Sequence, residues 1–126
     1  MNTIVFSDLS YKIIGAAFKV FNKLGWGLQE KHYQRALATE LNNIGVKFKE
    51  QASMPLKYEG KDIGRYFADF VIEDKILLEL KVVNKLGYSH SRQLLGYLKS
   101  FRIRLGILLY FTKDGVKYRR VLNSEV

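Results

Sequence analysis

The sequence predicts an α/β or α+β fold in which a central mixed β-sheet is flanked by helices. Apolar residues recur at helical spacing through the first 43 residues, and the pattern then changes to a period of two. A third helical segment follows near residue 90, before two more strand-like segments. Helices that alternate with strands in this way cover the faces of a sheet, because each element buries its apolar side against another.

Three segments have the spacing of amphipathic helices: residues 8–24, 28–43 and 89–102. At the first helix, Ser7 is available as an N-cap and Gly25 stops the helical pattern. In the second, Tyr33 lies on the apolar face, which predicts a buried core aromatic, and Gly45 follows the end of the helix. The sequence therefore predicts two helices before the first strand and one helix within the strand region.

The remaining segments alternate like strands, at residues 46–49, 56–58, 65–72, 76–83, 105–111 and 116–122. A turn at residues 53–55 is expected to separate the first two, and a second turn signal follows at residues 60–62. The short polar stretch 73–75 predicts a hairpin, and Asp114-Gly115 predicts the last turn. The strand at 76–83 is apolar on one face and largely apolar on the other, so we expect it at the centre of the sheet.

The composition indicates one soluble globular domain that covers residues 1–126. Hydrophobic residues make up 48% and charged residues 26% of the chain, which is ordinary for such a domain. No apolar run approaches the length of about 18 residues that a membrane span requires, and the N-terminus does not resemble a secretory signal. The chain has no cysteine, which excludes disulfides and thiolate metal sites and fits a cytoplasmic location.

The net charge of +9 is concentrated in the C-terminal part of the chain. Residues 1–80 hold 11 basic and 10 acidic side chains, a net of +1, whereas residues 81–126 hold 10 and 2, a net of +8. Such a basic segment attracts polyanions, although a merely solubilising surface would have the same composition. The candidate nucleic-acid-binding side chains are Arg92, Lys99, Arg102, Arg104, Lys117, Arg119 and Arg120.

The candidate catalytic residues lie on the two strands that the hairpin at 73–75 joins. Glu79 and Lys81 share one face of the second strand, opposite a row of apolar residues. If 73–75 is a three-residue loop, Asp69 lies directly opposite Glu79. Two carboxylates at cross-strand distance repel each other unless a cation lies between them, and hard divalent ions such as Mg²⁺ prefer such oxygen ligands. The alternative interpretation is an internal ion network without catalysis.

This arrangement resembles the PD-(D/E)xK nuclease superfamily, in which an Asp on one strand precedes Glu-x-Lys on the next. The proline position of that pattern is Ala68 here, a departure that removes no ligand. Upstream, Gly27, Glu30 and Tyr33 match the GxxExxY motif of a family of small bacterial and archaeal proteins in this superfamily. The resemblance extends over residues 8–122.

A further motif lies on the third predicted helix. Gln93 and Tyr97 resemble the QxxxY element of exonuclease-like members, and His90 stands where this family commonly has a histidine. All three share one helical stripe, because they are three and four residues apart. The positions of Gln93 and Tyr97 are equally consistent with side chains that line the active site and with side chains that pack the helix. The position of His90 is equally consistent with a side chain that faces phosphate and with a surface histidine.

The resemblance implies a restriction-endonuclease-like core and a metal-dependent nuclease that hydrolyses phosphodiester bonds, with DNA as the expected substrate. The metal, Mg²⁺ or Mn²⁺, would be held by Asp69, Glu79, the backbone carbonyl of Leu80 and Glu30. Lys81 would position the nucleophile, while Gln93 and Tyr97 would contact substrate or water. The alternative function is a non-catalytic nucleic-acid-binding module, or a subunit of a repair or defence complex, that keeps the fold. A domain of this size has limited grip on a duplex, which favours a homodimer or a protein partner.

Overall fold

The structure is a computed structural model that describes residues 5–84 and 87–126. Along the chain, the described elements are α1 (Ser7–Leu24), α2 (Glu30–Asn43), β1 (Phe48–Tyr58), β2 (Lys61–Ile72), β3 (Ile76–Val82), α3 (Tyr88–Phe101), β4 (Leu105–Thr112) and β5 (Gly115–Leu122). No helix in these ranges is both long enough and apolar enough to cross a bilayer.

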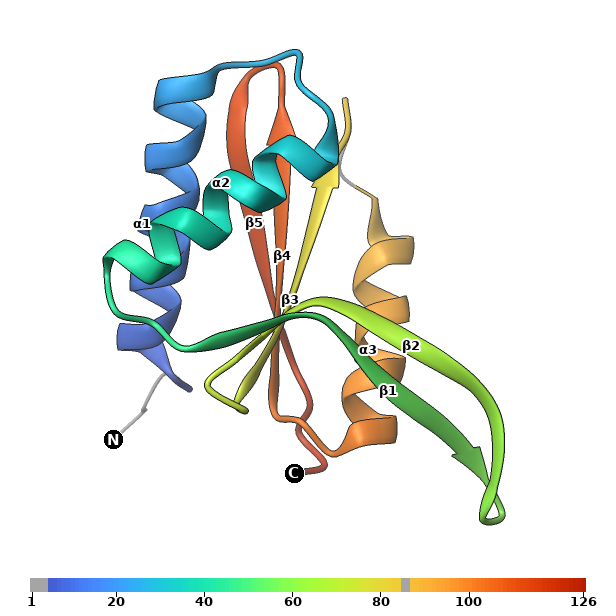
Figure 1. Ribbon diagram of the computed structural model, residues 1–126. Coiled ribbons are helices and arrows are strands. Elements are labelled where there is room, and N and C mark those ends of the chain that lie inside the picture. The colour runs from blue at the N-terminus through green and yellow to red at the C-terminus, as the bar shows by residue number, and fades with distance from the viewer. Residues whose placement is uncertain (1–4, 85–86) are drawn as a thin grey trace.

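The strands form one mixed sheet in the order β1-β2-β3-β4-β5 (Figure 1). Neighbouring strands are antiparallel except β3 and β4, which run parallel because α3 connects them as a crossover. The helices α1 and α2 cover one face of the sheet and α3 covers the other (Figure 1). The predicted mixed sheet flanked by helices is confirmed, and β3 occupies the central position that its apolar sequence predicted.

The two faces of the sheet carry separate apolar cores, and β3 contributes to both. Its even-numbered residues, from Ile76 to Leu80, are buried under α1 and α2, whereas Leu77 is buried under α3. Glu79 and Lys81 continue the row of Leu77, because alternate residues of a strand share a face. The central strand therefore carries its two charges on one face, as the alternation predicted, and this is the face that α3 covers.

The first strand differs from the prediction, because β1 runs without interruption through the segment where a turn was expected. Pro55 lies within β1 and pairs with Arg65 of β2. A proline is tolerated there because β1 is an edge strand, in which one row of N–H groups needs no partner. The predicted turn at 53–55 is therefore wrong. The chain reverses instead at Glu59 and Gly60, both with positive φ, where the second turn signal begins.

The helix boundaries agree with the prediction to within two residues, but Ser7 is not the N-cap. It is the first residue of α1, and Phe6 occupies the cap position without a side-chain cap hydrogen bond. Gly25 ends α1 with a φ of 70°, which glycine adopts without strain. Tyr33 is buried, and its hydroxyl donates a hydrogen bond to the Gly25 carbonyl at 2.5 Å. The predicted core aromatic thus also ties α2 to the end of α1.

The strands β2 and β3 pair over only three residues before they separate. Their hairpin closes with Ile72 opposite Ile76, as predicted, and the ladder ends at Phe70 opposite Leu78. Beyond that point β2 stays paired with β1 alone. Residues 52–68 therefore form a two-stranded arm that leaves the sheet beside α3 (Figure 1).

The packing of α3 on β4 depends on a close approach at Gly106. A Cβ atom there would lie 2.7 Å from Cδ2 and 2.9 Å from Cγ of Leu94, so the Leu94 side chain or the helix that carries it would have to shift. Gly106→Ala should therefore lower the free energy of unfolding by about 1–3 kcal/mol in urea titrations. Gly96→Ala is the matched control, because the space around that helical position is open, and it should be neutral or stabilising by up to about 1 kcal/mol. Equal stabilities of the two variants would contradict the close approach.

Candidate active site

Asp69 lies where β2 separates from β3, one residue beyond their last pair. Its Oδ2 accepts a hydrogen bond from the backbone N–H of Leu80 at 2.8 Å, so the side chain supplies an acceptor that the departing strand no longer provides. The predicted register of the hairpin is correct. Asp69 and Glu79, which were predicted to lie directly opposite each other, do not form a pair of the ladder. The strands have separated there, and the Asp69 carboxylate instead spans the opening to β3.

The carboxyl group of Glu79 is largely buried beside this opening. Its Oε1 has no hydrogen-bond partner among the described residues. Burial raises the pKa of Glu79 from its ordinary value of 4.5 to about 7, while the charge of Lys81 opposes the shift and that of Glu30 adds to it. An ionised carboxylate in such a place costs free energy unless a cation or further donors compensate it.

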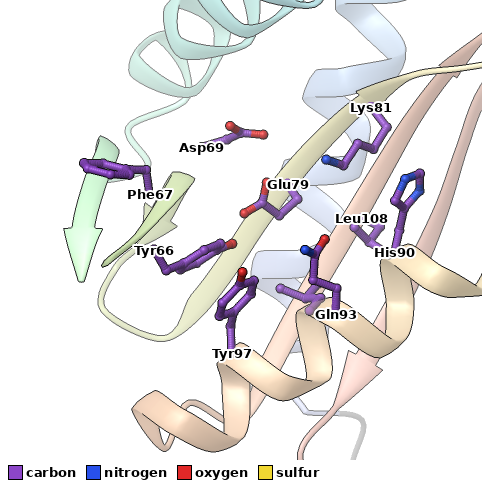
Figure 2. A pocket seen from close by; sticks show the side chains of 10 residues that line it. Tyr66, Phe67, Asp69, Glu79, Lys81, His90, Gln93, Tyr97 and Leu108 are labelled. Carbon is purple, nitrogen blue, oxygen red and sulfur yellow. The ribbon is translucent and has the colours of Figure 1, made fainter. Parts of the chain in front are cut away.

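The candidate catalytic side chains line one pocket between the strands and α3 (Figure 2). Its volume is about 250 Å³. Asp69 enters from β2, and Glu79 and Lys81 enter from β3. The rest of the lining comprises Tyr66, Phe67, His90, Gln93, Leu94, Tyr97 and Leu108. The structure thus brings together side chains that lie far apart in the sequence.

Three of these lining residues form the predicted stripe on α3, namely His90, Gln93 and Tyr97. Tyr97 also stacks on Tyr66 of the arm with ring centroids 3.8 Å apart, so it both lines the pocket and packs the helix. The Nδ1 atom of His90 is buried without a hydrogen-bond partner among the described residues. Burial lowers the pKa of His90, and the charge of Lys81 lowers it further. His90 is therefore not a plain surface histidine.

Glu30, the first residue of α2, lies near the pocket but does not line it. Partial burial raises the pKa of its carboxyl, the charge of Asp69 raises it further, and Lys81 lowers it. Within residues 5–84 and 87–126, no three acidic or histidine side chains are close enough to hold a metal ion together. The charges of Asp69 and Glu79 are nevertheless coupled to that of Glu30, so the three predicted acidic ligands lie within electrostatic range of one another. Glu30 begins the helix α2, which covers the face of the sheet opposite to α3.

The oxygen donors that do line the pocket suit a hard divalent cation. Mg²⁺ is usually held by one or two carboxylates together with water and substrate phosphate, and Mn²⁺ accepts the same donors. Asp69 and Glu79 supply the two carboxylates. Burial raises the pKa of Asp69, although the Leu80 N–H, Lys81 and Gln51 all oppose the shift. A cation between these groups would compensate both carboxylates and satisfy the Glu79 oxygen that has no partner.

Gln51 is a site residue that sequence reasoning missed. Its Nε2 donates to Oδ1 of Asp69 at 3.5 Å and to Oε1 of Gln34 at 3.4 Å. The residue lies within β1 but has a φ of 46°, a left-handed conformation that non-glycine residues rarely adopt in a strand. A glycine at this position would have indicated a positive φ within the strand. A glutamine in a segment that alternates like a strand gives no sign of it.

The seven predicted nucleic-acid-binding side chains do not share one surface. Arg120 lies on the α1 face, where its guanidinium donates to the carbonyl of Val5, whereas Arg119 lies on the α3 face. Alternation along β5 alone could have separated these two arginines. Lys99 pairs with Glu125 at 3.2 Å. The remaining four side chains are exposed: Arg92, Arg102, Arg104 and Lys117. Arg120 therefore lies on the opposite face of the sheet from the pocket.

Comparisons with known proteins agree with this fold. A family model described as the PD-(D/E)XK nuclease superfamily matches residues 7–121. An alkaline exonuclease (LHK-Exo) from Laribacter hongkongensis superposes with a TM-score of 0.57 at 13% identity, over 98% of this chain and 73% of that one. The crystal structure of SSO0001 superposes with a TM-score of 0.50 at 16% identity, over 94% and 79%. A search of curated proteins finds no match. At these identities the two structures support the fold alone.

The raised pKa of Glu79 predicts that the metal-free protein loses stability as the pH rises. The folded form binds its proton up to a pH of about 7, whereas the unfolded chain releases it near 4.5. The contribution to stability is therefore complete below 4.5 and is lost as the pH rises through 7.

Glu79→Gln keeps the shape of the side chain without its charge. Relative to wild type in EDTA, it should gain up to about 3 kcal/mol in unfolding free energy between about pH 5 and about pH 8. Urea titrations at both pH values measure this gain, with the exposed arm-tip variant Glu59→Gln as control. A difference that does not change with pH would show that Glu79 is not buried as described.

Proposed function

Because this chain belongs to the PD-(D/E)XK nuclease superfamily, we propose that it is a metal-dependent nuclease that hydrolyses phosphodiester bonds of DNA. The observation that carries the proposal is the convergence of two carboxylates and an amine in one pocket. Asp69 reaches this pocket from β2, and Glu79 and Lys81 reach it from β3, where the two strands separate (Figure 2). The opening gives a phosphate access to all three groups.

The proposed metal ligands are Asp69, Glu79, the backbone carbonyl of Leu80 and, from outside the pocket, Glu30. A bound Mg²⁺ or Mn²⁺ lowers the pKa of a coordinated water and offsets charge on the scissile phosphate. The hydrogen bond from the Leu80 N–H holds the Asp69 carboxylate in a fixed direction, and Gln51 contacts its other oxygen. Asp69 is thus oriented before any ligand enters.

Lys81 is the cationic group at the centre of this cluster. Its charge lowers the pKa of Glu30, Asp69 and Glu79, which places it within electrostatic range of all three acids. We assign it the role of orienting the attacking water and offsetting the negative charge that develops on the phosphate. Gln93, on the α3 side, contacts substrate or water.

Within the superfamily, we propose that the chain belongs to the group with the GxxExxY motif, and the fold gives the motif a physical role. Gly27 has a φ of 116°, which favours glycine. The Tyr33 hydroxyl accepts a hydrogen bond from the Leu28 N–H at 3.4 Å and donates one to the Gly25 carbonyl. These contacts hold the start of α2, and therefore Glu30, close to the pocket.

A non-catalytic nucleic-acid-binding module is the second candidate function. It is favoured by one observation, namely that Glu30 does not join the two pocket carboxylates in a three-ligand set among the described residues. In such a module the same pocket would contact phosphate through Lys81 without cutting it.

Glu79→Ala and Lys81→Ala should each lower Mg²⁺-dependent cleavage by at least about 100-fold, because each removes a group that stabilises the transition state. Cleavage is measured on linear, circular, branched and single-stranded DNA. Circular dichroism checks that both variants fold. Lys12→Ala, an exposed residue of α1 away from the pocket, is the control and should retain full activity. Cleavage at the wild-type rate by either pocket variant would overturn the mechanism.

Isothermal titration with Mn²⁺ separates the enzyme from the binding module. The wild-type protein should bind the ion, and Asp69→Asn should lose most of that binding, because the charge of one pocket carboxylate is removed. If wild type shows no binding of Mn²⁺ but shifts DNA in a salt-dependent manner without cutting it, the binding module is correct.

A further inference from the structure

Phe67 is a large apolar side chain that the fold leaves in solvent at the edge of the pocket. Its side chain is 55% exposed, yet it is one of the residues that line the pocket. Its neighbour Tyr66 stacks with Tyr97 and Phe101 beneath the arm. Figure 2 shows the ring of Phe67 pointing away from Tyr66, toward the outside of the arm. Burial in the core therefore does not explain this aromatic residue.

The arm has two distinct faces, and Phe67 lies on the outer one. Met54, Tyr66 and Ala68 pack into the apolar cluster under α3. Burial alternates over residues 52–57 of β1 and 65–68 of β2, so the side chains between the packed ones point outward. The inner face thus anchors the arm, and the outer face is open to a ligand.

The outer face continues directly from the candidate active site. Phe67 lines the same pocket as Asp69, and Arg65 is the next alternate residue of β2 after Phe67, about 7 Å further along the arm. The Nε of Arg65 donates to the Ser53 hydroxyl at 2.5 Å, which holds the guanidinium on this face. An aromatic ring at the pocket edge is therefore followed along the outer face by a cation.

We propose that Phe67 stacks on an unpaired base next to the scissile phosphate, so that the substrate is single-stranded nucleic acid or a frayed end. This inference rests on the proposed function and specifies its substrate class. Bases within a duplex are already stacked on both sides, whereas an unpaired base can offer a face to an aromatic ring. Such stacking does not depend on the base, so no sequence preference is expected.

The charges around Phe67 favour a nucleic acid over a protein as the occupant of this face. Arg65 lies beside it along β2, and Lys81 lies across the pocket. Both cations suit phosphate groups on either side of a stacked base. The chain as a whole carries a net charge of +9, which opposes the approach of a second copy and attracts a polyanion.

Binding of labelled oligonucleotides in EDTA, followed by fluorescence anisotropy, tests the proposal without cleavage. Phe67→Ala should weaken binding of a single strand by about tenfold or more, the usual effect of losing one base–aromatic stack. Binding of a blunt duplex of the same length should change by less than about twofold. Tyr58→Ala is the matched control, because this aromatic is 63% exposed at the tip of the arm, outside the pocket. It should bind both ligands as wild type does.

A tryptophan at position 67 reports stacking directly. In a Trp26→Phe background, which removes the native indole, Phe67→Trp should keep the affinity for the single strand. Its fluorescence should be quenched when a homopolymeric oligonucleotide binds. Tyr58→Trp in the same background should show no quenching. Quenching of both tryptophans, or of neither, would overturn the assignment of stacking to Phe67.

The outcomes for the two proposals are distinguishable. If wild type cuts no substrate but Phe67→Ala selectively weakens single-strand binding, the nuclease proposal fails and the stacking role stands. If wild type cuts DNA and Phe67→Ala affects neither ligand, or both equally, the stacking role fails alone. If Phe67→Ala changes only the oligomeric state in size-exclusion chromatography, the ring is a protein contact and the stacking role also fails.

Discussion

The hydrogen bond from the Leu80 N–H to the Asp69 carboxylate joins two strands at the point where they stop pairing. Residues 70–72 hold β2 against β3, and beyond them β2 follows β1 away from the sheet. The pocket exists because of this separation. If the ladder had continued, Asp69 and Glu79 would form one more cross-strand pair with little space for a ligand. The side-chain bond links the two strands across the opening and holds one acidic group in a fixed direction.

The electrostatic character of the pocket is opposite to that of the molecule. Burial raises the pKa of Glu79, Asp69 and Glu30, and Lys81 is the cation that opposes the shift at each of them. A protein with a net charge of +9 thus surrounds a small acidic centre. Holding ionisable groups out of water costs folding free energy. Such groups are typical of functional sites. The acidic centre favours a cation, while the surrounding surface favours a polyanion.

The arm shows how one pair of strands can be both anchored and exposed. A two-stranded ribbon is only marginally stable by itself, and the arm gains stability from its inner face. Tyr66 stacks between the arm and α3, against Tyr97 and Phe101. The stacking of Tyr66 on Tyr97 holds the arm and also forms part of the pocket wall, because both residues line the pocket. Because side chains alternate along a strand, anchoring one row leaves the next row, with Phe67, facing solvent.

The sequence by itself determined the order of the elements, the central place of β3, the face shared by Glu79 and Lys81, and the hairpin that sets Ile72 opposite Ile76. All of these follow from local rules, because side-chain period, turn length and apolar content act within a few residues. Only the tertiary structure decided that Pro55 continues an edge strand, that Gln51 turns toward Asp69, and that β2 leaves β3 beside the site. Those features arise from contacts between segments distant in the chain, which no local pattern encodes.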